Sequence, residues 1–155
     1  MRSILYPLAI ALFFVGFLAI PLANAQEISA KDIDLRIETF DEIDKLFKAL
    51  RFKVVNQRST NHEAALKFSS QLVELVYRLP DLFDVPSAAD AFPQSRSRPE
   101  IWSRKTFFDA QMFEFVDNLE DINDEIKAGN LTKAGQLIDE TAKGCRRCHN
   151  AFRYK

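Results

Sequence analysis

The sequence predicts an all-α protein, an antiparallel four-helix bundle, and three observations favour this fold class. The 155 residues include 14 phenylalanines but only 4 glycines, so long apolar side chains outnumber the usual turn formers. Hydrophobic residues make up 47% and charged residues 28%, a balance typical of one globular domain with one core. Apolar residues also recur at helical spacing in four separate segments, which together make a bundle.

The first 25 residues are typical of a signal peptide. Arg2 gives the N-terminal region a positive charge, and residues 4–20 carry no charge. Ala23-Asn24-Ala25 matches the A-x-A pattern of a signal-peptidase cleavage site. We expect residues 26–155 to be the mature domain, exported to the periplasm. An uncleaved membrane anchor is the alternative, because the apolar run is close to the length that spans a bilayer.

The expected mature chain has a small negative charge. Removal of Arg2 leaves 20 basic and 22 acidic side chains, a formal net charge of −2. A protein without an overall basic field is a poor nucleic-acid binder, so we expect no nucleic-acid partner.

The first two predicted helices each carry one apolar stripe with steps of three and four residues. Asn61 is placed to cap the second helix, and Pro80 is expected to stop it. The stripes consist of Ile33, Ile37, Phe40, Ile43, Phe47, Leu50 and Val54, and of Ala65, Phe68, Leu72, Val76 and Leu79.

The third and fourth helices are joined by a tight turn at Gly129, which is expected to end the third helix. The link from Pro80 to Ser103 is long and contains four prolines, and links of this length are usually functional. The stripes consist of Phe108, Met112, Phe115, Leu119, Ile122 and Ile126, and of Ala134, Leu137, Ile138, Thr141, Cys145, Cys148 and Phe152 in a helix from about residue 131 to 154.

The fourth helix contains C-x-x-C-H, the attachment signature for haem c, at Cys145, Cys148 and His149. Two cysteines three residues apart face the same side of a helix, so both sulfurs reach the vinyl groups of one porphyrin. The next residue then presents an imidazole to the iron. We therefore expect one covalent haem c.

A pair of cysteines with this spacing has three other interpretations. A redox pair is expected near a βαβ pattern, which the sequence lacks. A structural zinc site needs four ligands, and only His62 adds to the three residues of the motif. A disulfide between helical cysteines three apart would be strained and would leave His149 without a role.

The chain resembles the cytochrome c′ family over residues 30–155. The resemblance lies in the segment from Gly144 to Arg153, in Arg98-Pro99-Glu100-Ile101-Trp102, and in Leu79-Pro80 followed by Phe83. In the first helix it lies in Arg36, Phe40 and the apolar spacing of Ile43, Phe47, Leu50 and Val54.

This resemblance implies a bundle with haem between the helices and a homodimer through the first two helices. It implies that His149 is the only protein ligand of the iron and that Phe40 covers the vacant distal position. Arg36 would lie near a haem propionate, and Arg153 beside His149 on the proximal side. Ile37 departs from the family, which commonly has glutamine at that position.

The state of the sixth iron position decides the function. Six-coordinate relatives use a methionine from the first helix, whereas the expected mature chain has only Met112, in the third helix. We expect Met112 to be a core residue and His62, beside a polar joint, to be exposed. The sequence thus predicts a five-coordinate haem under an apolar distal cap.

Such a haem favours small uncharged gases such as nitric oxide and carbon monoxide. A periplasmic electron carrier is the alternative, since electron transfer to a redox partner needs no open iron position, and haem storage is a third reading. Arg146 and Arg147, between the cysteines, form either a docking surface or a solvated face. No nucleophile–base arrangement is recognisable in the sequence, so we do not expect the protein to be an enzyme.

Overall fold

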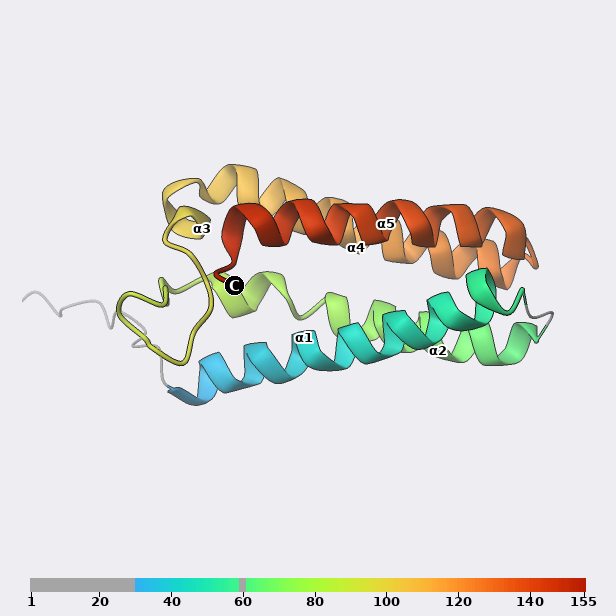
Figure 1. The fold of residues 1–155 in the computed structure, drawn as a ribbon, viewed down its shortest axis with the longest axis horizontal. Coiled ribbons are helices and arrows are strands. Elements are labelled where there is room, and N and C mark those ends of the chain that lie inside the picture. The colour runs from blue at the N-terminus through green and yellow to red at the C-terminus, as the bar shows by residue number, and fades with distance from the viewer. Residues whose placement is uncertain (1–29, 59–60) are drawn as a thin grey trace, which may run out of the picture.

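The computed structural model describes residues 30–58 and 61–155 and is an antiparallel four-helix bundle (Figure 1). The long helices are α1 (Ala30–Arg51), α2 (His62–Val76), α4 (Lys105–Lys127) and α5 (Leu131–Phe152). A short helix, α3 (Glu100–Ser103), precedes α4, and the described residues form no β-strand. The predicted signal peptide lies outside the described residues.

Helix α1 confirms the predicted first helix and most of its apolar stripe. Ile33, Ile43 and Leu50 are buried as predicted, and Arg36, which was not part of the stripe, is only 4% exposed. Ile37 is 36% exposed, so its predicted place in the core is wrong. Because successive residues turn by about 100° around a helix, the arc that buries Arg36 and Ile43 leaves Ile37 outside.

The end of α1 widens into a π-helical turn, η1 (Phe52–Asn56). Turns of this kind are rare, and nothing in the apolar spacing indicated one. The turn buries Val54 and brings Val54 and Val55 against Gly135 of α5.

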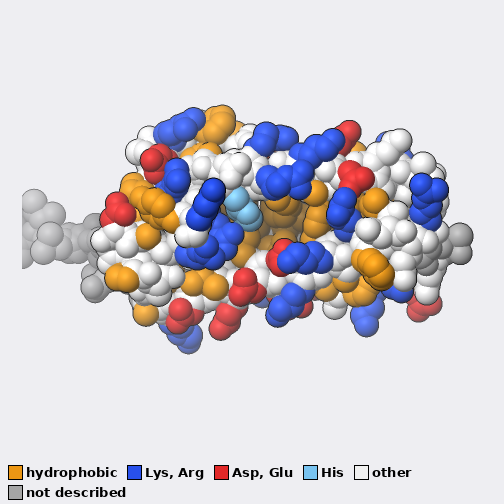
Figure 2. Space-filling view, viewed as in Figure 1, with side chains coloured by type: hydrophobic (Ala, Val, Ile, Leu, Met, Phe, Trp, Pro, Cys, Tyr) orange, Lys and Arg blue, Asp and Glu red, His pale blue; other side chains and the backbone are white. Residues whose placement is uncertain are grey.

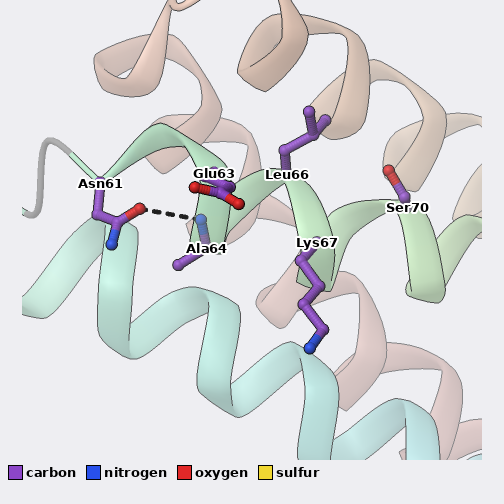
Figure 3. A pocket seen from close by; sticks show the side chains of 6 residues that line it. All are labelled: Asn61, Glu63, Ala64, Leu66, Lys67 and Ser70. Carbon is purple, nitrogen blue, oxygen red and sulfur yellow. Dashed lines mark hydrogen bonds between the residues drawn. The ribbon is translucent and has the colours of Figure 1, made fainter.

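Helix α2 begins and ends near the predicted residues. The Oδ1 of Asn61 accepts a hydrogen bond of 3.0 Å from the amide of Ala64, which confirms the predicted cap (Figure 3). Pro80 opens a 3₁₀ turn, η2 (Pro80–Phe83). His62 is not exposed as expected: it is partly buried, and its Nε2 contacts the carbonyl oxygen of Ile126 at the end of α4.

The core runs along α4 and confirms most of the predicted third stripe. Met112 is 5% exposed within it, so the prediction of a core methionine is confirmed. Gly129 has a φ of +79°, the left-handed conformation expected of a residue that follows a helix end. The buried residues of α4 are Phe108, Met112, Val116, Leu119, Ile122, Asn123 and Ile126.

The four long helices are not packed equally around the core. Extensive contacts join α1 to α2, α2 to α4, and α4 to α5, whereas α1 meets α5 at few positions. Near the end of α1, Arg51 closes this seam by an ion pair of 2.8 Å to Asp139 of α5. The ribbons of α1 and α5 diverge toward the C-terminal end of α5 (Figure 1), in keeping with the few contacts between these two helices.

Candidate functional site

The predicted attachment residues lie together in the last turns of α5. Cys145 and Cys148 are both half-buried free thiols, and Cys148 packs against the core. Burial raises the pKa of both thiols, that of Cys148 to about 11. Both sulfurs are therefore protonated at neutral pH.

His149 follows on the same helix and is exposed. Although the residue as a whole is exposed, partial burial of its imidazole lowers the pKa of His149, the positive charge of Arg153 lowers it further, and the Asp44 carboxylate opposes both. The imidazole is therefore neutral at pH 7, as a nitrogen ligand of iron must be. The amide of Arg153 donates to the carbonyl oxygen of His149 at 3.0 Å, so the two residues are neighbours at the end of α5.

The opposite wall of the seam is α1. Asp44 lies close enough to α5 to raise the pKa of Cys145 and His149 by its charge, against the larger effect of burial on His149. Figure 2 shows this face of the molecule hollowed between α1 and α5, with hydrophobic side chains on its floor. A histidine and several basic side chains surround the hollow. An apolar recess beside two thiols and a neutral imidazole fits an apolar, planar group attached to α5.

Phe40 lies half-buried on α1, where its ring meets the edge of Phe83 at a centroid distance of 6.1 Å. Phe83 packs at 4.9 Å against Phe108, which meets Phe152 of α5 at 5.2 Å. This row of rings connects α1, η2, α4 and the end of α5. It carries no polar atom, so it holds Phe40 without offering a hydrogen bond to anything in the seam.

Arg36 is held by the long link instead of by another helix. Its guanidinium donates to the hydroxyls of Ser87 at 2.7 Å and Ser95 at 2.9 Å and lies 4.8 Å from the centre of the Phe83 ring. Burial lowers the pKa of Arg36 to about 10, so the group is still a cation at neutral pH. Among the described residues no carboxylate pairs with it. A buried cation surrounded by neutral acceptors suits a nearby anion such as a propionate.

Three residues of this site were not singled out as functional from the sequence. Ser87 and Ser95 lie in a proline-rich link without periodicity, and Phe83 was noted only for its family resemblance. The signal that could have found them is the position of Arg36 on the apolar stripe, three residues after Ile33 and seven before Ile43, because a buried guanidinium needs several acceptors.

The two alternative axial ligands are both engaged by other parts of the protein. Met112 is buried in the hydrophobic core, and His62 contacts Ile126 at the end of the bundle where α5 begins. A shallow hollow lined by Asn61, Glu63, Ala64, Leu66, Lys67 and Ser70 also lies at this end, on α2 (Figure 3). In residues 30–58 and 61–155, His, Cys, Asp and Glu side chains form no group of three or more able to hold a metal ion.

No helix within the described part of the chain has both the length and the apolar character needed to cross a membrane.

A family model described as Cytochrome C′ matches residues 31–153. A cytochrome c′ of Alcaligenes xylosoxydans xylosoxydans is 34% identical over 59 residues, which are 38% of this chain. The match spans 46% of that relative, about half its length.

Solved structures share the whole fold. The cytochrome c′ of Rubrivivax gelatinosus has a TM-score of 0.71 at 19% identity, covering 79% of this chain and 94% of that one. The cytochrome c′ of Shewanella frigidimarina has a TM-score of 0.71 at 20% identity, covering 83% and 98%. A ferrous variant of the Alcaligenes xylosoxidans cytochrome c′ with bound NO has a TM-score of 0.72 at 21% identity, covering 80% and 94%.

Proposed function

This chain belongs to the cytochrome c′ family, whose members carry a covalent haem c, and we propose that it is a periplasmic haem protein that binds nitric oxide or other small uncharged gases. The observation that carries the proposal is the seam between α1 and α5. Half-buried thiols and a neutral imidazole stand on one side of it and Phe40 projects from the helix on the other.

The residues of α5 hold the cofactor in this proposal. Cys145 and Cys148 would hold the haem through two thioethers, the S–H of each adding across one vinyl group with sulfur on one carbon and hydrogen on the other. His149 would provide a nitrogen ligand to the iron, and burial together with the positive charge of Arg153 keeps its imidazole unprotonated. Arg36 is a buried cation without a carboxylate partner in the described residues. Its guanidinium would form an ion pair with a haem propionate.

Phe40 covers the distal side of the haem in this proposal. When bound, the haem would supply an iron centre able to take up a diatomic gas. The Phe40 ring would exclude water from the side of the iron that faces α1 and offers no hydrogen-bond donor, so anionic and strongly polar ligands would be disfavoured. An uncharged gas enters when the ring moves aside. This function is binding without turnover.

The test is an absorption spectrum of the purified protein in the ferric and ferrous states, with and without nitric oxide. We expect a high-spin, five-coordinate spectrum that nitric oxide changes in the ferrous state. A low-spin, six-coordinate ferrous spectrum before gas is added would contradict the open position.

Attachment is tested separately. The double variant C145A/C148A should lose haem on a denaturing gel stained for haem, while each single variant keeps one thioether and part of the stain. Haem retention by the double variant under denaturing conditions would contradict attachment through these residues.

We also propose a homodimer through α1 and α2. Leu35 on α1 is 50% exposed, and Tyr77 at the end of α2 is 56% exposed, so both helices offer apolar surface to a partner. Sedimentation analysis of L35E should show more monomer than the unmodified protein, and an unchanged dimer would count against this interface.

A further inference from the structure

Two distant segments meet beside the C-terminal end of α5. The amide of Tyr154 donates to the carbonyl oxygen of Arg96 at 2.9 Å, and the amide of Arg98 donates to the carbonyl oxygen of Phe152 at 2.9 Å. Ser97 and Arg153 form the antiparallel bridge between these bonds. The pairing fixes the long link against the end of the chain that carries the attachment motif.

Both segments are basic. Residues 96–107 and 141–155 contain nine basic side chains and one acidic one, Glu100, in a chain with a formal net charge of −1. Among the described residues, the ion pairs involve only Lys105 of this basic set, which bonds to Asp109. The fold therefore concentrates positive charge that the sequence distributes over two separate stretches.

Aromatic rings lie under some of these charges. The guanidinium carbon of Arg104 is 4.7 Å from the centre of the Phe107 ring, and that of Arg98 is 5.0 Å from the centre of the Tyr154 ring. The two rings are 48% and 38% exposed. Arginine and aromatic residues are the types most enriched at the energetic centres of protein interfaces.

We propose that this surface docks an acidic one-electron redox protein. We name it the basic–aromatic surface, and it consists of Arg96, Arg98, Arg104, Phe107, Arg153, Tyr154 and Lys155. The inference rests on the proposed haem site. Arg153 belongs to this surface and follows His149 by one helical turn, so the surface lies next to the proposed iron ligand. A partner seated here would pass one electron to the haem: the centre of the partner would be oxidised by one unit, the ferric iron would become ferrous, and no bond or proton would be exchanged.

The partner is a protein and not a membrane for a geometric reason. The stacked guanidiniums are planar donors held in place, and they match carboxylates in a bidentate manner. The aromatic rings lie half-buried under them, whereas binding at a lipid surface requires apolar side chains that reach into the acyl region. A cluster of carboxylates complements this arrangement.

The experiment measures binding of the haem-loaded protein to a small acidic [2Fe–2S] ferredoxin by calorimetry, at low and at physiological ionic strength. Charge reversals R104E and K155E are compared with K67E, a matched reversal of an exposed lysine on α2. We expect R104E and K155E each to weaken binding about fivefold or more, K67E less than twofold, and added salt to weaken binding throughout.

Two outcomes overturn the docking surface. One is equal binding by all three variants. The other is charge-sensitive binding to vesicles containing phosphatidylglycerol with none to the ferredoxin, which would make the surface a membrane contact. The haem absorbance of each preparation is recorded first. Colourless protein would count against the haem site, whereas coloured protein with charge-insensitive binding counts only against docking.

Discussion

The ring of Phe40 meets the ring of Phe83 edge to face, with centroids 6.1 Å apart and planes inclined at 71°. Phe83 in turn packs against Phe108 of α4. The side chain proposed to cover the iron is therefore supported by a ring from the long link, and its mobility depends on this contact.

Removal of this ring should open the distal side. We expect F40A to bind carbon monoxide about tenfold faster in the ferrous state, because the ring no longer has to move, which corresponds to a barrier lower by about 1.4 kcal/mol. Flash photolysis measures the rate. F47A, a matched removal of a half-buried ring from the same helix, should change it little. Equal rates in F40A and the unmodified protein would place the ring away from the gas.

The bond between Arg36 and Ser87 should stabilise the fold. S87A removes a buried acceptor 2.7 Å from a buried cation, and we expect the free energy of unfolding to fall by about 1–3 kcal/mol in urea titrations. S103A, at an exposed serine, is the control and should stay within about 0.5 kcal/mol. If both variants unfold alike, Arg36 takes its stability from other acceptors.

Two glycines should respond to the same substitution with opposite signs. Gly129 has a φ of +79°, which alanine adopts only with strain, so G129A should lower the free energy of unfolding by about 1 kcal/mol. Gly135 lies inside α5, where an added Cβ would meet Val54 and Val55 at ordinary contact distances of 3.7 and 3.8 Å. G135A should therefore raise the free energy of unfolding by about 0.5–1 kcal/mol.

Thermal unfolding of both variants measures this difference. A loss of stability in G135A would mean that the contact between η1 and α5 is tighter than the structure places it.

Acidification should weaken the contact between the end of α4 and the start of α5. Hydrogen bonds from Lys133 and then from Asn130 hold the pKa of Glu125 below its ordinary value. A carboxylate with a lowered pKa stabilises the folded state above its unfolded pKa, and this contribution is lost as the pH falls through the folded pKa.

The variant E125Q lacks this titration. Its melting temperature should lie slightly below that of the unmodified protein at neutral pH and approach it below about pH 4. The comparison needs melting curves across acidic pH, and a constant difference between the two proteins would show that the Glu125 contacts do not depend on its charge.

Local patterns predicted the elements of this fold. The four helices, the Asn61 cap, the left-handed Gly129 and the core position of Met112 all depend on residues within a few positions of one another. Helical geometry relates such neighbours in the same way in any protein, so spacing alone suffices. The same reasoning failed for Ile37 and His62, because the burial of a residue at the edge of a stripe or the start of a helix depends on what the rest of the chain places there.

The sequence by itself thus determined the helices and the cluster of Cys145, Cys148 and His149, since the chemistry of that motif lies within five consecutive residues. Only the tertiary structure decided that α1 and α5 stay apart, that Ser87 and Ser95 hold Arg36, and that the link pairs with the end of α5. These relationships join residues more than fifty positions apart. They arise when the whole core packs, so no local period of the chain records them.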